Sequence, residues 1–309
     1  MKHVELNLGL SCNHKCIFCM SGITREKIRG FESKELIEKE ISLLSSKGYN
    51  SIGFLGGEPT IHPYFLDLLF YAKENNFQNI EVISNASTFH NKKFLLQAIK
   101  DGLTRISLSI HSHISKKEEF LSGGIIGILD KKIQSLENII NLYKNGFLKR
   151  ELSVNMVISK INFREIKDTI LFLYKKGVRS FRINFIQLEG TSTKNYSILA
   201  LRYEEFLPYL KDILNLANQH NDIRINFESI PWCFSGLDYF DFLKYSEQSI
   251  DKEKYKLSRD DIDFITRDII SQKWDRGRVK DYISKCNYCF LKGDCEGIWN
   301  RYIDYYKIK

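Results

Sequence analysis

The 309-residue sequence lacks the features that define several protein classes. No apolar run reaches the roughly 18 residues that a membrane-spanning helix requires. The first residues, MKHVELNLGLSC, lack the basic start, apolar run and cleavage site of a secretory signal. There is no internal repeat and no low-complexity tract, and the 43% apolar content excludes a disordered or collagenous chain. We therefore expect a folded cytoplasmic protein that makes no use of a membrane.

The sequence also lacks the charge pattern of a nucleic-acid-binding protein. The formal net charge is +8, but basic residues are spread over many predicted helices beside acidic ones, as in IKDTILFLYKKG. Neither a basic stripe nor a known nucleic-acid module accompanies them. The charge is best interpreted as solvated helix surface, and nucleic acid is not an expected partner.

Strand-like and helix-like segments alternate along most of the chain, separated by turn signals. This alternation predicts right-handed crossovers and a parallel sheet, as an open doubly wound sheet or as a full or partial barrel. In either form the functional groups gather at the carboxyl ends of the strands. The predicted strands are 4–8, 51–55, 80–84, 105–110, 152–158, 180–186 and 223–227, and the predicted helices are 33–47, 64–75, 91–100, 130–145, 164–176 and 203–218.

The alternation stops near residue 229. The remaining residues carry mixed helix-like and loop-like sequence and four of the seven cysteines. We therefore predict a core domain over residues 1–228 and a C-terminal extension over residues 229–309.

The first three cysteines, Cys12, Cys16 and Cys19, lie in one loop after the first predicted strand. An odd number of clustered cysteines in a cytoplasmic chain favours metal binding over disulfides. Three thiolates can bind three irons of a [4Fe-4S] cluster and leave the fourth iron open. A zinc site is the alternative, but it requires a fourth ligand, and His14 has an unsuitable position in the loop.

A second motif, Gly56-Gly57-Glu58, follows the second predicted strand. Two glycines let the backbone approach a ligand closely, and carbonyl and carboxylate oxygens accept hydrogen bonds from an ammonium group. Together with the Cys-x3-Cys-x2-Cys motif, this turn resembles the radical S-adenosylmethionine (radical SAM) enzymes over about the first 230 residues. The resemblance implies a partial (β/α)6 TIM-like barrel of α/β class.

The resemblance also implies site residues. Binding of S-adenosyl-L-methionine would involve Phe18 near the adenine and the Gly-Gly-Glu turn at the amino group. Ser84 and Asn85 would lie at the ribose, and Ser109 would lie at the carboxylate. Asn155 is a further candidate cofactor-binding residue, and it and Asn184 would point from their strands into the cavity. His111 and His113 would lie at the mouth of the cavity, with His111 as a catalytic candidate. Many relatives have an arginine after the fourth strand that pairs with the cofactor carboxylate, whereas this loop reads LSGGIIGILDKK.

The chemistry that the resemblance implies is reductive. An electron from the reduced cluster, supplied by a flavodoxin or ferredoxin-type reductant, cleaves S-adenosylmethionine to methionine and a 5′-deoxyadenosyl radical. That radical abstracts a hydrogen atom from the substrate, so the cofactor carries the difficult chemistry and the protein positions and shields.

Four further cysteines, Cys233, Cys286, Cys289 and Cys295, lie in the extension. Four thiolates complete either a second [4Fe-4S] cluster or a structural zinc site. The arrangement resembles the SPASM or twitch extensions that hold auxiliary clusters in radical SAM enzymes, and the barrel context favours the cluster over zinc. Cys233 is distant in sequence from the others, so it is either a ligand or a free thiol that donates a hydrogen atom to a substrate radical.

Auxiliary clusters occur in many radical SAM enzymes that modify ribosomally synthesised peptides (RiPP maturation). The leading hypothesis is therefore a peptide maturase that forms a crosslink or alters a side chain. Because Cys12 lies so near the start, we expect either a separate leader-binding protein or a small-molecule substrate. The alternatives are a small-molecule radical SAM enzyme, such as a sugar or cofactor dehydrogenase, and a non-catalytic electron-transfer or nucleic-acid-binding metalloprotein.

Overall fold

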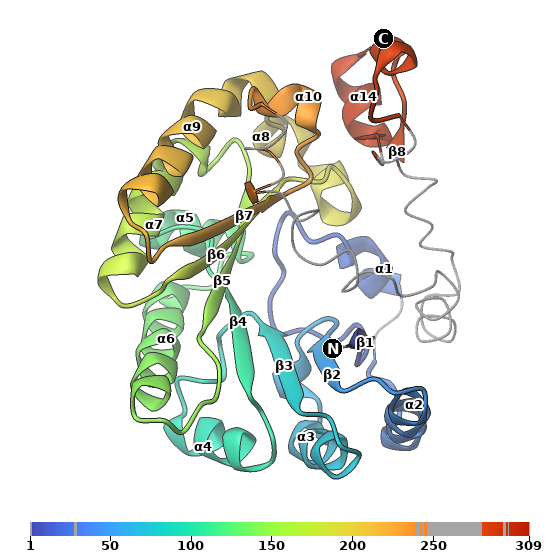
Figure 1. Ribbon diagram of the computed structural model, residues 1–309, viewed down its shortest axis with the longest axis vertical. Coiled ribbons are helices and arrows are strands. Elements are labelled where there is room, and N and C mark those ends of the chain that lie inside the picture. The colour runs from blue at the N-terminus through green and yellow to red at the C-terminus, as the bar shows by residue number, and fades with distance from the viewer. Residues whose placement is uncertain are drawn as a thin grey trace.

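The computed structural model describes residues 2–27, 30–238, 242, 244–245, 280–292, 295 and 297–308. Its centre is a sheet of parallel strands that follow one another in space in the order in which they occur in the chain. Figure 1 shows this sheet curled into an open half-barrel. The expected partial barrel is confirmed, with seven strands in the sheet. The strands are β1 (His3–Asn7), β2 (Ser51–Leu55), β3 (Asn79–Ser84), β4 (Arg105–Ser109), β5 (Ser153–Ile158), β6 (Ser180–Phe185) and β7 (Arg224–Glu228).

Helices cover the outer face of the curled sheet (Figure 1). Local capping defines where several begin: the Ser33 side chain accepts a hydrogen bond from the Leu36 N–H, and Asn91 does the same for Phe94. The long helices are α2 (Lys34–Ser46), α3 (Phe65–Glu74), α4 (Lys92–Lys100), α6 (Ile128–Lys144), α7 (Ile166–Lys175) and α9 (Tyr203–Gln219).

Every predicted strand and long helix is present, with ends within two residues of the prediction. The short elements between them were not predicted, because one or two turns carry too few apolar positions to show a period. These are the helices α1 (Gly22–Lys27), α5 (Ser115–Leu121), α8 (Tyr196–Leu199) and α10 (Trp232–Ser235), and the 3-10 turns η1 (Pro59–Ile61), η2 (Phe163–Glu165) and η3 (Gly190–Lys194).

The two faces of the sheet differ in chemistry. Along β6, Phe181, Ile183 and Phe185 are at most 1% exposed and pack in the apolar core, whereas Arg182 and Asn184 alternate with them and are half-buried. Alternate residues of a strand point to opposite faces, so the polar residues share the inner, concave face. The core lies between the sheet and the outer helices, and the inner face is left for polar groups.

The described part of the C-terminal extension contacts the barrel through α14 (Asn300–Tyr306). The backbone N–H of Tyr203, at the start of α9, donates a hydrogen bond of 2.9 Å to the Tyr302 hydroxyl. The rings of these two tyrosines lie 4.3 Å apart. The other described elements of this region are the pair β8 (Lys280–Asp281) and β9 (Ile298–Trp299) and the turn η5 (Ser284–Tyr288).

The predicted boundary between residues 228 and 229 coincides with the end of β7. Division of the chain into two domains there stays a prediction. Among the helices that the structure describes, none combines the length and apolar character needed to cross a membrane.

Candidate functional site

The loop that carries Cys12, Cys16 and Cys19 joins β1 to α1 and is fixed by main-chain hydrogen bonds on two sides. On one side, the N–H groups of Lys15 and Ile17 donate to the carbonyls of Ser122 and Leu121, at the end of α5. On the other side, Thr191 of η3 donates its N–H to the carbonyl of Cys19 at 2.9 Å. The loop conformation is therefore set by segments that are distant in the sequence.

Burial disfavours the thiolate form of two of the three thiols. Burial raises the pKa of Cys16 to about 12 and also raises that of Cys12, so bound iron would be needed to stabilise the thiolates. The backbone N–H of His14 and the amide of Asn85 lie 3.4 and 3.8 Å from the Cys12 sulfur. Both can stabilise a thiolate there.

Zinc is the alternative to a cluster in this loop. A tetrahedral zinc with Zn–S bonds near 2.3 Å requires its sulfurs about 3.8 Å apart. Across the described residues, no three His, Cys, Asp or Glu side chains converge closely enough to hold one metal ion. The His14 side chain, weighed above as a fourth ligand, is buried inside the loop, and its Nδ1 has no hydrogen-bond partner.

The Gly56-Gly57-Glu58 turn lies directly against the end of β1. The N–H of Gly57 donates to the Gly9 carbonyl at 2.8 Å, and the N–H of Glu58 donates to the Ser11 carbonyl at 2.9 Å. A Cβ atom on Gly57 would lie 2.1 Å from the Ser11 carbonyl oxygen, which is impossible without movement of the backbone. Glycine is therefore required for this turn to reach the cysteine loop.

The Glu58 carboxylate is 1% exposed and is occupied by protein donors. It accepts hydrogen bonds from the Ser84 hydroxyl at 2.8 Å, from the Asn85 N–H at 2.6 Å and from Thr60. Burial raises the pKa of Glu58, and these hydrogen bonds oppose that rise. The carboxylate thus joins the end of β2 to the end of β3, where the Asn85 amide lies beside Cys12.

A buried ion pair at the end of β4 was not predicted from the sequence. Lys132 of α6 and Glu118 of α5 are 1% and 0% exposed and lie 2.5 Å apart. Lys132 also donates to the Ser109 carbonyl at 2.9 Å, and Glu118 accepts the N–H groups of His111 and Ser112 at 2.8 and 2.7 Å. The sequence signal that could have indicated this pair is the position of Lys132 among the buried apolar residues of α6.

His111 is buried beside the cysteine loop. Its Nδ1 accepts the N–H of Val157 at 3.0 Å, and its ring lies edge-on to Phe18 with centroids 4.7 Å apart. Burial lowers the pKa of His111 to about 4, so the ring is neutral at pH 7. His113 instead contacts the Thr169 hydroxyl of α7. A catalytic role for His111 stays a prediction.

The inner face of the sheet brings the two predicted strand asparagines together. The Asn184 amide donates a hydrogen bond to the Asn155 amide oxygen. Asn155 in turn lies opposite Ser109 in the β4–β5 register. These three residues therefore lie together on the concave face.

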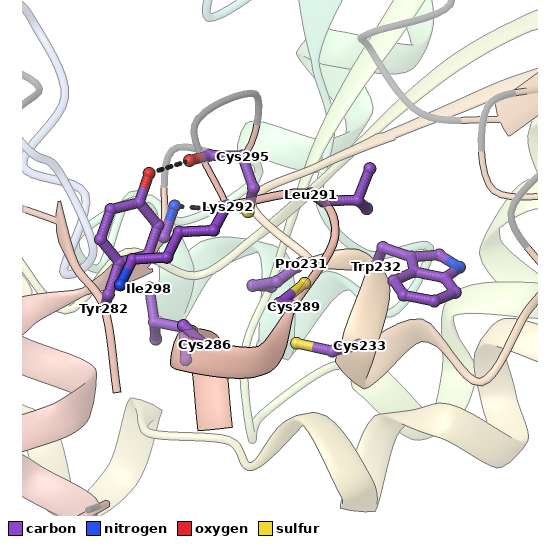
Figure 2. Close-up of a pocket in the computed structure, with 11 residues that line it drawn as sticks. Pro231, Trp232, Cys233, Tyr282, Cys286, Cys289, Leu291, Lys292, Cys295 and Ile298 are labelled. Carbon is purple, nitrogen blue, oxygen red and sulfur yellow. Dashed lines mark hydrogen bonds between the residues drawn. The ribbon is translucent and has the colours of Figure 1, made fainter. Parts of the chain in front are cut away.

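The structure also gathers the four C-terminal cysteines around one pocket, together with Pro231, Trp232, Leu291 and Ile298. Figure 2 shows Cys233 reaching from α10 towards the segment that carries Cys286 and Cys289. Burial raises the pKa of Cys233 to about 11 and that of Cys295 above its ordinary value. All four are free thiols, but no three of them converge closely enough in the described structure to hold one metal ion, and the second metal site stays a prediction.

Comparison with known proteins agrees with this geometry. The family model of the radical SAM superfamily matches residues 6–186, more than half of the chain. The chain is 30% identical over 219 residues to a GTP 3′,8-cyclase of Clostridium botulinum, covering 69% of this chain and 65% of that protein. It is 26% identical to an S-adenosylmethionine-dependent nucleotide dehydratase of Flammeovirga pacifica, covering 67% of this chain and 70% of that protein. The chain thus spans less than two thirds of the cyclase.

Two solved structures share the fold. The enzyme anSMEcpe with bound AdoMet superposes with a TM-score of 0.63 at 14% identity, over 99% of this chain and 94% of that protein. Streptococcus suis SuiB bound to its precursor peptide SuiA superposes with a TM-score of 0.56 at 19% identity, over 74% of this chain and 48% of that protein.

The segment that matches the family model contains both the three-cysteine loop and the Gly-Gly-Glu turn, the two features that form the site described above. The chain belongs to the radical SAM superfamily.

Proposed function

We propose that this radical SAM enzyme modifies a ribosomally synthesised peptide, either by a crosslink or by alteration of a side chain. The observation that carries the proposal is the pocket lined by Cys233, Cys286, Cys289 and Cys295 in the extension. Four thiolates can complete a second [4Fe-4S] cluster, and such clusters are typical of peptide-modifying members of the family. Zinc at this site is the alternative, and iron analysis separates the two.

In the proposed active site, Cys12, Cys16 and Cys19 hold the first cluster, and its fourth iron is open to S-adenosylmethionine. The cluster and S-adenosylmethionine together supply a 5′-deoxyadenosyl radical when they are bound. Because the Glu58 carboxylate is occupied by Ser84 and Asn85, the backbone of the Gly56-Gly57 turn is the part available to the amino group. Phe18 is fixed against His111 and presents a ring for the adenine.

The loop after the fourth strand has no arginine that could pair with the cofactor carboxylate, and Lys132 is the cation at the end of this strand. Its charge lies at the Ser109 carbonyl, at the end of β4 where the cofactor carboxylate is expected. Lys132 is paired with Glu118 and almost fully buried. We propose that it supports the carboxylate site by fixing the position of Ser109 rather than by direct contact.

With all four cysteines of the extension as ligands, no thiol remains to donate a hydrogen atom to a substrate radical. The second cluster would then serve electron transfer, with a flavodoxin or ferredoxin-type protein as external reductant.

The second candidate function is a small-molecule reaction. Its support is the sequence similarity to proteins named GTP 3′,8-cyclase, at 30% identity, and to a nucleotide dehydratase. On this account the substrate would be a nucleotide or a related sugar or cofactor precursor.

Activity assays of the anaerobically reconstituted enzyme distinguish the two candidate functions. The substrates to be tested are the precursor peptide encoded beside the gene and GTP. We expect a mass change in the peptide together with peptide-dependent 5′-deoxyadenosine. The variant Cys16→Ala should produce neither. Turnover of GTP with an unchanged peptide mass would establish the small-molecule function instead, and 5′-deoxyadenosine from the Cys16→Ala variant would favour a non-radical protein.

A further inference from the structure

The inner face of the last three strands carries a compact polar surface. The β5–β6 and β6–β7 registers align Asn155 with Arg182 and Asn226, and Asn184 with Glu228. Residues aligned across neighbouring strands point to the same face. None of them lies in the apolar core, so this surface borders the open side of the half-barrel.

Two interactions organise this surface. The Asn184 amide donates to the Asn155 oxygen, and the Arg182 Nε lies 3.0 Å from a Glu228 carboxylate oxygen. The Arg182 and Glu228 side chains keep 31% and 18% of their area exposed, so a ligand can reach them. An amide pair and an ion pair therefore lie side by side, next to the strand end at Ser109.

The charges on the strands are balanced. The sheet strands contain three arginines, and each has a carboxylate partner: Arg105 with Glu81, Arg182 with Glu228, and Arg224 with Glu151. The lysine at the end of β4, Lys132, is paired with Glu118. Recognition of a triphosphate requires cations that are free to contact its oxygens. Every arginine of the sheet strands, and Lys132, already has a carboxylate partner, so these residues provide no excess positive charge for a triphosphate.

A neutral polar surface of this kind suits a peptide backbone. An asparagine amide presents N–H donors and a carbonyl acceptor, the same kinds of group that a peptide bond exposes. A substrate peptide can exchange its own N–H and C=O groups for the Asn184–Asn155 hydrogen bond at little net cost. The Arg182–Glu228 pair lies beside these amides and restricts the charge that the neighbouring substrate residue can carry.

We propose that Asn155, Asn184, Arg182 and Glu228 form a substrate-recognition surface that binds an uncharged, extended peptide segment through its backbone amides. This inference rests on the proposed peptide-modifying function and adds the residues and the substrate class that determine specificity. It places the segment on the inner face of β5–β7, next to the proposed cofactor site.

The test is binding of the precursor's core peptide, as a synthetic labelled probe, to the reconstituted enzyme with S-adenosylmethionine. The variant Asn184→Ala should weaken binding about tenfold, the loss expected for one buried hydrogen bond to the ligand. The matched control is Ser180→Ala, on the same strand and face but at its opposite end, and its binding should equal that of the wild type. Asn184→Ser serves as a second variant if Asn184→Ala fails to fold.

GTP at millimolar concentration should not displace the peptide, and its displacement of the peptide would overturn the inference. If the wild type modifies the peptide and Asn184→Ala and Asn184→Ser bind it normally, the recognition surface is wrong while the proposed function stands. If the wild type neither binds nor modifies the peptide, both are wrong.

Discussion

At the scale of single residues, the most consequential feature is the Glu118–Lys132 pair. Both side chains are almost fully buried, and between them they join α5, α6 and the end of β4. Burial alone would raise the pKa of Glu118, but Lys132 and the N–H groups of His111 and Ser112 hold it below its ordinary value. The pair also fixes α5, whose last carbonyls accept hydrogen bonds from the cysteine loop.

Breaking this pair should destabilise the protein strongly. Lys132→Met leaves the Glu118 charge buried without its partner, and we expect a loss of about 3–5 kcal/mol in the free energy of unfolding. The double variant Glu118→Leu/Lys132→Met should recover part of that loss, because no uncompensated charge remains. Anaerobic urea unfolding measures both. If the loss in the free energy of unfolding of the double variant equals the sum of the losses of the two single variants, the two side chains do not interact as described.

His111 should give the protein a specific dependence on acid. Its pKa is about 4 in the folded state because of burial, against about 6.5 in an unfolded chain. The unfolded state then binds more protons between these values, so stability falls as the pH decreases through this window. From pH 7 to pH 5 this one group should cost about 2 kcal/mol.

Urea unfolding at both pH values checks this, with His111→Asn as the comparison. The variant should lose less stability than the wild type over the same interval. Equal losses in the two proteins would show that His111 does not control the acid response.

At the scale of elements, the Gly-Gly turn after β2 depends on its close approach to β1. A Cβ on Gly57 would collide with the Ser11 carbonyl, whereas one on Gly53, in the middle of β2, would make only ordinary contacts. Gly57→Ala should therefore weaken S-adenosylmethionine binding at least tenfold, by about 1.4 kcal/mol or more. Gly53→Ala should bind like the wild type. Equilibrium dialysis measures the binding of S-adenosylmethionine to both variants. Normal binding by Gly57→Ala would be evidence against the turn as the cofactor site.

Much of the element order could be predicted from the sequence because its signals are local. Apolar period, Ser and Asn caps and glycine stops fix the strands and long helices, and the cysteine spacing identifies the first cluster loop. The occupation of Glu58 by Ser84 and Asn85 could not be predicted, because it depends on the β2–β3 register. The Asn184–Asn155 contact and the Glu118–Lys132 pair are likewise set by packing between elements far apart in the chain.

At the scale of the whole molecule, the described part of the extension is attached to the barrel through α14. The Tyr302 hydroxyl accepts the N–H of Tyr203, and Arg301 pairs with Glu189 of the barrel at 3.5 Å. Tyr302→Phe leaves a buried N–H unpaired and should cost about 1–3 kcal/mol in the free energy of unfolding. Tyr305→Phe, at a 40% exposed position on the same helix, is the control and should change it little. Equal effects of the two substitutions would contradict this attachment.

We propose that the seven cysteines divide into two iron–sulfur sites, with three ligands in the barrel and four in the extension. The most direct test is iron and zinc analysis with Mössbauer spectroscopy of the anaerobically reconstituted protein. The wild type should contain about eight irons per chain, and Cys286→Ser/Cys289→Ser and Cys12→Ala/Cys16→Ala/Cys19→Ala should each retain about four. About four irons and one zinc in the wild type, with the zinc lost from Cys286→Ser/Cys289→Ser, would contradict a second cluster.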